Sequence, residues 1–241
     1  MAEGASMPDW AGTGKRPFPS AVLFDLDGTL LDSAPDMLAT VNRMRAARGI
    51  APMLLAELRP HVSKGARAMT SAAFPEWDIA TRDAHVPEFL GLYQEEMGRH
   101  GVLFDGVADL LAAFDATGTP WGIVTNKPEY LARAILPQFG WEARCAVLIG
   151  GDTLAERKPH PLPLQVAAER IDRAASDCTY VGDDVRDIQA GRAAGMATVA
   201  ALWGYRPHGD DPLGWGADVL VERPRDLLVP GCWPGVMARA T

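Results

Sequence analysis

Short apolar runs alternate with helical patterns along most of this 241-residue chain. Contiguous apolar runs bounded by turn residues are typical of strands that are buried on both faces of a sheet. This alternation of strands and helices predicts an α/β fold in which an open parallel sheet carries helices on both faces. The predicted strands are residues 21–24, 121–124, 146–149, 179–181, 198–202 and 218–221, and the predicted helices between them are residues 107–117, 128–139, 161–171 and 185–194.

One stretch, residues 32–104, interrupts the alternation, because it contains helical patterns and no convincing strand. Pro35 suits the first turn of a helix, and apolar residues recur at helical spacing after it. Further helices are predicted near residues 64–73 and 82–99. The sequence therefore predicts a helical insert between the first two strands of the sheet.

Polar residues follow three of the predicted strands. Asp25 and Asp27 follow the first strand, Thr125 follows the second, and Asp183 follows the strand that ends at residue 181. Because the carboxyl ends of parallel strands meet at one rim, where such sheets bind ligands, we expect these side chains to converge. Two carboxylates one residue apart are costly to keep ionised without a cation nearby. The turn at Gly28-Thr29 offers a backbone N–H and a hydroxyl to an anion.

Composition sets broad limits on function. The chain is 48% hydrophobic and 22% charged, as in ordinary globular proteins, and its net charge is −8. This charge argues against a nucleic-acid scaffold and against adhesion to an anionic membrane. The N-terminal residues lack the apolar run of a signal peptide or a membrane span, so we expect a cytoplasmic protein, either a monomer or a homodimer. The three cysteines are scattered, and no cysteine–histidine spacing indicates zinc.

Four motifs resemble, in order, those of the phosphatases in the haloacid-dehalogenase-like hydrolase superfamily. They are Asp25-Leu26-Asp27-Gly28-Thr29-Leu30, Thr125-Asn126-Lys127, Lys158-Pro159-His160-Pro161 and Gly182-Asp183-Asp184-Val185-Arg186-Asp187. The resemblance extends from about Val22 to Leu227. It implies a Rossmann-like core (residues 20–32 and 105–229) with an inserted α-helical cap (residues 33–104), whose hinges lie near residues 32–34 and 103–106. A flexible N-terminal tail (residues 1–19) and a C-terminal tail (residues 230–241) are expected to flank these parts.

The resemblance also implies roles for the motif residues. Asp25 is the expected nucleophile, which forms an aspartyl-phosphate, and Asp27 is the expected general acid and then base. The implied cofactor is Mg²⁺, held by the Asp25 carboxylate, the Asp27 backbone carbonyl and Asp183, because hard oxygen ligands suit this ion. The groups expected to bind phosphate are Thr125, Asn126 and Lys158. Asp187 is expected to hold a metal-bound water or Lys158. Asp184 either shares that task or only starts the following helix. The sequence does not decide whether the Lys127 side chain faces the substrate or the solvent.

The implied function is a Mg²⁺-dependent phosphatase that hydrolyses a small phosphorylated metabolite. Two groups within the superfamily are similar to different stretches of the chain, namely phosphoglycolate phosphatases and the N-acetylmuramic acid 6-phosphate phosphatases of cell-wall recycling. A dehalogenase would need neither Asp27 nor Asp183, whereas a sugar phosphomutase shares the aspartyl-phosphate chemistry and stays an alternative. A non-enzymatic binding module should have lost a nucleophile or a metal ligand, and none is missing from the motifs.

Specificity is expected to come from the cap, because the core motifs are occupied with the phosphoryl group and the metal. The candidate segment contains Lys64, Gly65 and Arg67, which place two cations beside a glycine. Both candidate substrates carry a carboxylate besides the phosphate, and an arginine can bind such a group through two hydrogen bonds. The alternative is that both cations are solvated residues at a helix start.

Overall fold

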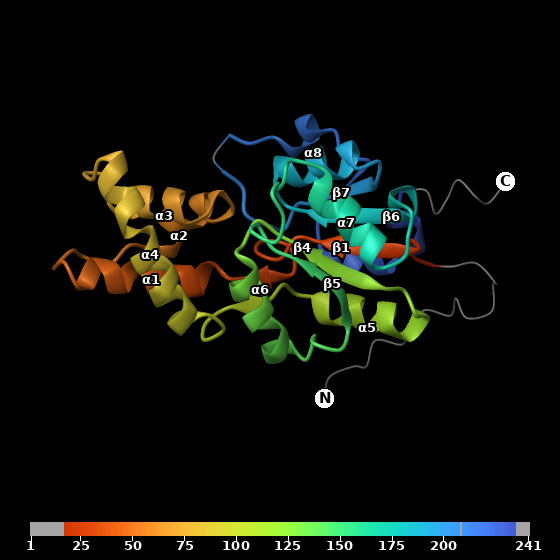
Figure 1. The fold of residues 1–241 in the computed structure, drawn as a ribbon, viewed down its shortest axis with the longest axis horizontal. Coiled ribbons are helices and arrows are strands. Elements are labelled where there is room, and N and C mark those ends of the chain that lie inside the picture. Colours follow the sequence, from red (N-terminus) through yellow and green to blue (C-terminus); the bar gives the residue numbers. More distant parts are fainter. Residues whose placement is uncertain (1–16, 208, 235–241) are drawn as a thin grey trace.

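A computed structural model describes residues 17–207 and 209–234, and its centre is a six-stranded parallel sheet (Figure 1). The strands lie in the order β5-β4-β1-β6-β7-β8, and each neighbouring pair is parallel. Their bounds are β1 Ala21–Phe24, β4 Trp121–Val124, β5 Cys145–Ile149, β6 Cys178–Gly182, β7 Ala197–Ala201 and β8 Val219–Val221. The predicted α/β fold is therefore confirmed, and each strand lies within about one residue of its predicted bounds.

Helices cover both faces of the sheet because successive residues of each strand point to opposite faces. In β1, Val22 and Phe24 pack in a core cluster with residues of α5, whereas Ala21 and Leu23 pack with residues of α7. Figure 1 shows α7 and α8 on one side of the sheet and α5 on the other. The bounds of these helices are α5 Val107–Thr117, α6 Glu129–Ile135, α7 Leu162–Arg170 and α8 Val185–Ala193.

The chain leaves the core after β1 and forms four helices beyond the carboxyl ends of the strands (Figure 1). These helices are α1 Ala34–Ala46, α2 Leu55–Leu58, α3 Ala66–Ala73 and α4 Ile79–Glu96, and a 3₁₀ helix at Arg59–Lys64 lies between α2 and α3. We call residues 34–96 the helical insert. Its position agrees with the predicted insertion point, while the exact division of the chain into core and cap stays a prediction.

The expectation that residues 32–104 contain no strand was wrong. Two residues at each end of this stretch, β2 Leu31–Asp32 and β3 Val102–Leu103, pair as a small antiparallel ribbon. Strands of two residues are too short to show a period-two pattern, so no sequence signal marks them. The ribbon brings together the segment that leads into the helical insert and the segment that returns from it to the core.

Two predicted helices also differ in the structure, for local reasons. The segment expected to be one helix over 128–139 is α6 followed by a 3₁₀ turn at Leu136–Phe139, because Pro137 has no backbone N–H to continue α-helical bonding. The helix expected near 64–73 begins only at Ala66, because Gly65 has a φ of 80° and starts a new direction.

Both predicted tails begin further from the core than expected. Phe18 is buried, and its ring lies 4.9 Å from that of Phe114 and 6.2 Å from that of Trp233, between ring centroids. Trp233 is buried as well, and its indole N–H donates to the Leu227 carbonyl at 2.8 Å. The rest of the expected tails, residues 1–16 and 235–241, lies outside the described residues. Among the helices that the structure describes, none combines the length and apolar character that a membrane crossing requires.

Candidate active site

The first part of the site is a chain of contacts between Asp25, Lys158 and Asp187. The Lys158 ammonium lies 3.0 Å from Asp25 Oδ1 and 2.8 Å from Asp187 Oδ1, and it donates to the Tyr180 hydroxyl at 2.7 Å. Burial disfavours its charge, but the carboxylates of Asp187 and Asp25 outweigh this effect and raise the pKa of Lys158. The lysine is therefore a positive charge held beside Asp25 and Asp187, while its role toward phosphate stays a prediction.

The second part is Asp183, which is buried at the carboxyl end of β6. Its carboxylate accepts from the Tyr205 backbone N–H at 2.8 Å and from the Thr29 hydroxyl at 3.2 Å. Gly28 makes this approach possible, since a Cβ built on it would lie 2.1 Å from Asp183 Oδ2. Burial, together with the charges of Asp25 and Asp187, raises the pKa of Asp183 well above its usual range. The ionised form of this carboxyl thus needs a further positive charge.

These carboxylates fit a divalent cation. One oxygen from each of Asp25, Asp183 and Asp187 lies within 4.8 Å of the others, and two of the three residues are buried. These three carboxylates face a single ammonium group, that of Lys158, which leaves two negative charges unbalanced when all three are ionised. Hard oxygen donors and a deficit of two positive charges are the setting in which proteins bind Mg²⁺.

The second motif lies at the same rim, after β4. Thr125 is buried, and its hydroxyl accepts from the Lys127 backbone N–H at 3.3 Å. The Asn126 side-chain amide donates to the Lys158 carbonyl at 2.9 Å, so it holds the loop that carries Lys158. The Asn126 side-chain oxygen is buried without a hydrogen-bond partner among the described residues. A contact between Asn126 and a phosphate oxygen would use its backbone N–H or the second N–H of its side-chain amide.

Asp27 has partners that the sequence did not indicate. The Ser33 hydroxyl donates to Asp27 Oδ1 at 2.7 Å, and the Lys127 ammonium donates to both carboxylate oxygens at 3.1 and 3.0 Å. Lys127 also donates to the Tyr93 hydroxyl at 2.7 Å, and Tyr93 belongs to α4 of the helical insert. The Lys127 side chain is buried between Asp27 and Tyr93, so it does not face solvent.

Asp184 is the N-cap of α8 and is held away from the carboxylate cluster by Arg186. The Arg186 side chain makes two hydrogen bonds to the Asp184 carboxylate, at 2.7 and 3.0 Å, and this pairing holds the pKa of Asp184 below its usual value even though burial opposes the shift. Arg186 also donates to the Ser63 carbonyl of the helical insert at 2.5 Å. Arg186 is thus a contact between core and insert that sequence reasoning missed.

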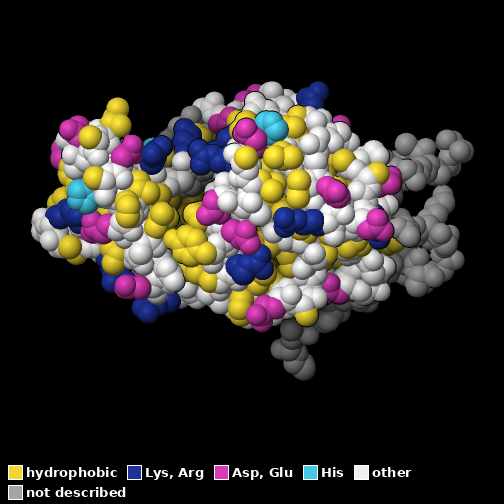
Figure 2. All heavy atoms as spheres, in the orientation of Figure 1, with side chains coloured by type: hydrophobic (Ala, Val, Ile, Leu, Met, Phe, Trp, Pro, Cys, Tyr) yellow, Lys and Arg dark blue, Asp and Glu magenta, His cyan; other side chains and the backbone are white. Residues whose placement is uncertain are grey.

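The expected specificity segment, which contains Lys64, Gly65 and Arg67, approaches the carboxylates of the site only at its N-terminal end. The Ser63 hydroxyl lies 3.5 Å from Asp183 Oδ2, so the residues before Gly65 approach the carboxylates. Lys64 is exposed, and the Arg67 side chain is 74% exposed and paired with Asp83 at 2.9 Å. Figure 2 shows lysine and arginine side chains gathered along the boundary between the insert and the core.

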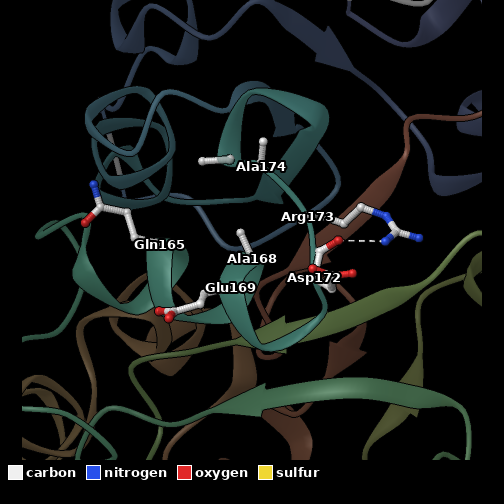
Figure 3. Close-up of a pocket in the computed structure, with 7 residues that line it drawn as sticks. Gln165, Ala168, Glu169, Asp172, Arg173 and Ala174 are labelled. Atoms are coloured by element: carbon white, nitrogen blue, oxygen red, sulfur yellow. Dashed lines mark hydrogen bonds between the residues drawn. The ribbon is translucent and has the colours of Figure 1, made fainter.

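A separate surface hollow lies at the carboxyl end of α7 (Figure 3). It is lined by residues that include Gln165, Glu169 and Asp172, all of which are exposed. This segment leads into the amino end of β6. It therefore lies at the amino ends of the strands, whereas Asp25 lies at their carboxyl ends. Exposed polar groups without a buried partner give no basis for catalysis there, and the candidate site is the rim at the carboxyl ends of the strands.

Comparison with known proteins agrees with this geometry. Residues 22–201 match the model of the family described as haloacid dehalogenase-like hydrolase. A phosphoglycolate phosphatase of Xanthomonas campestris pv. campestris is 66% identical over 217 residues, which are 90% of this chain and 98% of that protein. An N-acetylmuramic acid 6-phosphate phosphatase of Pseudomonas aeruginosa is 44% identical over 215 residues, which are 89% of this chain and 95% of that protein.

A solved structure from Haemophilus somnus, described as a "predicted phosphoglycolate phosphatase", has the same fold. Its TM-score is 0.78 at 26% identity, over 89% of this chain and 98% of that one. The resemblance that the four motifs indicated is thereby confirmed, as is the expectation of an enzyme that hydrolyses phosphoric monoesters. The chain belongs to the haloacid dehalogenase-like hydrolases and is one of the phosphatases of that family.

Proposed function

We propose that this phosphatase depends on Mg²⁺, forms an aspartyl-phosphate at Asp25, and takes 2-phosphoglycolate as its substrate. The observation that carries the proposal is the grouping of Asp25 and Asp183, which follow neighbouring strands, with Asp187 and Lys158 at the same rim of the sheet. The relatives that are 63–66% identical to this chain and are named phosphoglycolate phosphatases support the choice of substrate.

In the first step, a carboxylate oxygen of Asp25 attacks phosphorus, and the bond between phosphorus and the ester oxygen breaks. The carboxyl of Asp27 gives its proton to the departing alkoxide, so that an alcohol leaves. The Lys158 ammonium and the Thr125 hydroxyl balance charge on the equatorial phosphate oxygens. A Mg²⁺ ion held by Asp25, the Asp27 carbonyl and Asp183 would neutralise charge shared by the nucleophile and the phosphate.

In the second step, Asp27 acts as a base. It takes a proton from water while the water oxygen attacks the phosphorus of the aspartyl-phosphate, and the bond between phosphorus and the Asp25 oxygen breaks. Inorganic phosphate leaves, Asp25 is again a carboxylate, and Asp27 is protonated for the next cycle. Asp187 holds Lys158 in place throughout, and we infer a structural role at the start of α8 for Asp184.

N-acetylmuramic acid 6-phosphate is the second candidate substrate, favoured by the 44% identical relative that bears that name. Both candidate substrates carry a carboxylate besides the phosphate. We therefore propose that Lys64, Gly65 and Arg67 of the helical insert distinguish carboxylated leaving groups from those without a carboxylate. The insert would then act as a cap that closes over the phosphate.

A panel of phosphate esters tests the proposed function. Phosphate release is measured from 2-phosphoglycolate, N-acetylmuramic acid 6-phosphate and glucose 1-phosphate, each with Mg²⁺ and with excess chelator. We expect the highest kcat/KM for 2-phosphoglycolate, and activity only with Mg²⁺. A higher value for the sugar acid would replace the substrate but keep the mechanism. Conversion of glucose 1-phosphate to its isomer, dependent on a bisphosphate and without release of phosphate, would instead identify a phosphomutase.

A further inference from the structure

We propose that Lys127 is a positioning residue for Asp27, and that Tyr93 of the helical insert completes this support. The proposal rests on the proposed function only in taking Asp27 as the group that protonates the leaving alkoxide. No step described above uses Lys127 or Tyr93. Neither residue belongs to the carboxylate cluster at Asp25, and they come from different parts of the fold, a core loop after β4 and helix α4.

The contacts of Lys127 leave it no free donor. An ammonium group has three N–H donors, and here they face Asp27 Oδ1, Asp27 Oδ2 and the Tyr93 hydroxyl, at 3.1, 3.0 and 2.7 Å. The Lys127 side chain is 4% exposed. A buried lysine whose donors are all used is suited to hold a neighbouring side chain, and it is poorly suited to bind an incoming ester.

Lys127 fixes both oxygens of Asp27, whereas the other partner fixes one. The Ser33 hydroxyl donates to Oδ1, so among the contacts of the described residues a carboxyl without Lys127 would keep a single hydrogen bond and could turn about its side-chain torsions. Proton transfer needs the donor within hydrogen-bond reach of the leaving oxygen. A misplacement of about 1 Å at such a group can cost roughly a hundredfold in rate.

Tyr93 links this support to the helical insert. It is buried at 1% exposure on α4, and its ring stacks on Phe89 of the same helix with centroids 6.1 Å apart. Its hydroxyl is the only partner of the Lys127 ammonium, among the contacts of the described residues, that comes from the insert. The position of the insert therefore bears on how Lys127 holds Asp27.

The test compares leaving groups that need a proton with one that does not. Lys127→Met keeps the length of the side chain and removes its ammonium. We measure kcat/KM for 2-phosphoglycolate, for 2-hydroxyethyl phosphate, and for p-nitrophenyl phosphate, whose nitrophenolate leaves without protonation. Because kcat/KM covers events only up to loss of the leaving group, hydrolysis of the aspartyl-phosphate does not enter. We expect a loss of about a hundredfold for both alkyl esters and less than about fivefold for the aryl ester.

Three results would overturn the proposal. A loss confined to 2-phosphoglycolate would make Lys127 a binding residue for the substrate carboxylate. Equal losses on all three esters would mean that it supports the fold of the site, and unchanged values would mean that Asp27 does not need it. If the wild-type enzyme does not hydrolyse 2-phosphoglycolate, the proposed substrate is wrong, and the other two esters still test Lys127.

Tyr93→Phe provides a second test that keeps the charge of Lys127, in case Lys127→Met does not fold. It removes only the hydroxyl, and we expect the ratio of alkyl to aryl kcat/KM to fall by about three- to tenfold. Tyr130→Phe is the matched control, because Tyr130 is 48% exposed on α6 and should leave the ratio unchanged. An unchanged ratio in Tyr93→Phe would refute the role of the insert in positioning Asp27.

Discussion

Gly28→Ala is expected to weaken the binding of Mg²⁺ much more than it lowers the thermal stability of the protein. Gly28 follows Asp27, the proposed general acid, in the chain, packs against Asp183, and has a φ of 90°. A methyl group on it would lie 2.1 Å from Asp183 Oδ2 and 2.6 Å from its Cγ, where van der Waals contact requires more than 3 Å. Asp183 is held by Thr29 and by the Tyr205 backbone, so the side chain cannot move away without losing hydrogen bonds. The substitution therefore displaces a proposed metal ligand.

Two effects of different size follow. The left-handed backbone conformation costs an alanine about 1–2 kcal/mol, and for a chain of this length each kcal/mol lowers the Tm by about 2–4 °C. Displacement of Asp183 acts on the metal instead, since changes around metal ligands cost roughly 10- to 100-fold in affinity or activity. We thus expect a modest fall in Tm and a 10- to 100-fold rise in the Mg²⁺ concentration for half-maximal activity.

Gly118→Ala is the matched control. Gly118 has a φ of 67°, and a Cβ built on it meets no atom within 4 Å, so it brings the backbone cost without the clash. The assay is a titration of phosphatase activity with Mg²⁺, together with thermal unfolding of both variants. A fall in Tm in both variants, larger in Gly28→Ala because of the clash, with a shifted titration in Gly28→Ala alone, would support the metal site. An unchanged Mg²⁺ titration in folded Gly28→Ala would refute the placement of the ion at Asp183.

Three further predictions concern the nucleophile, the metal and the insert. Asp25→Asn is expected to lower kcat more than about a thousandfold, more than 4 kcal/mol of barrier, with an unchanged circular dichroism spectrum, because an amide is a poor nucleophile; substantial turnover in a verified preparation would exclude Asp25. Chelation should abolish phosphate release, Mg²⁺ should restore it, and Ca²⁺ should inhibit, since its looser coordination misplaces the nucleophile; full activity in excess chelator would contradict this. Arg67→Ala should lower kcat/KM about 10- to 100-fold for 2-phosphoglycolate and hardly affect p-nitrophenyl phosphate. No loss on either ester would mean that Arg67 only pairs with Asp83 and does not bind substrate.

Much of the core could be predicted from the sequence because its signals are local. A parallel strand buried on both faces is a contiguous apolar run, and the residue that follows it lies at the ligand-binding rim. Asp25, Thr125 and Asp183 each follow such a run, so their convergence required no knowledge of tertiary contacts. Lys158 has no strand before it, and it was placed by the resemblance of its motif to that of the family.

The supports of Asp27 could not be predicted because they depend on contacts that are distant in sequence. Lys127 lies 100 residues from Asp27 and 34 from Tyr93, and no periodic pattern connects them. Tyr93 follows Phe89 by four residues, a spacing that places both on one face of a helix but indicates no contact with the core. Ser33 was recognised as part of a hinge, and its hydroxyl could have been considered as a partner of the nearby Asp27.

The ends of the chain illustrate a different limit. Phe18 lies in an N-terminal segment whose composition predicts a tail, and Trp233 lies beyond Leu227, where the resemblance to the family ends. In the structure each fills a place against Phe114 that only the folded core creates. A single aromatic residue of this kind carries no periodic pattern, so neither composition nor the extent of the resemblance places it against Phe114.

The most direct test of the account is to trap the phosphorylated enzyme. Wild-type protein is mixed with Mg²⁺ and 2-phosphoglycolate labelled in its phosphoryl group, quenched in acid within the time of one turnover, and digested for peptide mapping. We predict protein-bound phosphate on Asp25, formed and lost at rates no slower than turnover, and none in Asp25→Asn. Label on a different residue, or full turnover with no labelled protein at any time, would contradict covalent catalysis at Asp25.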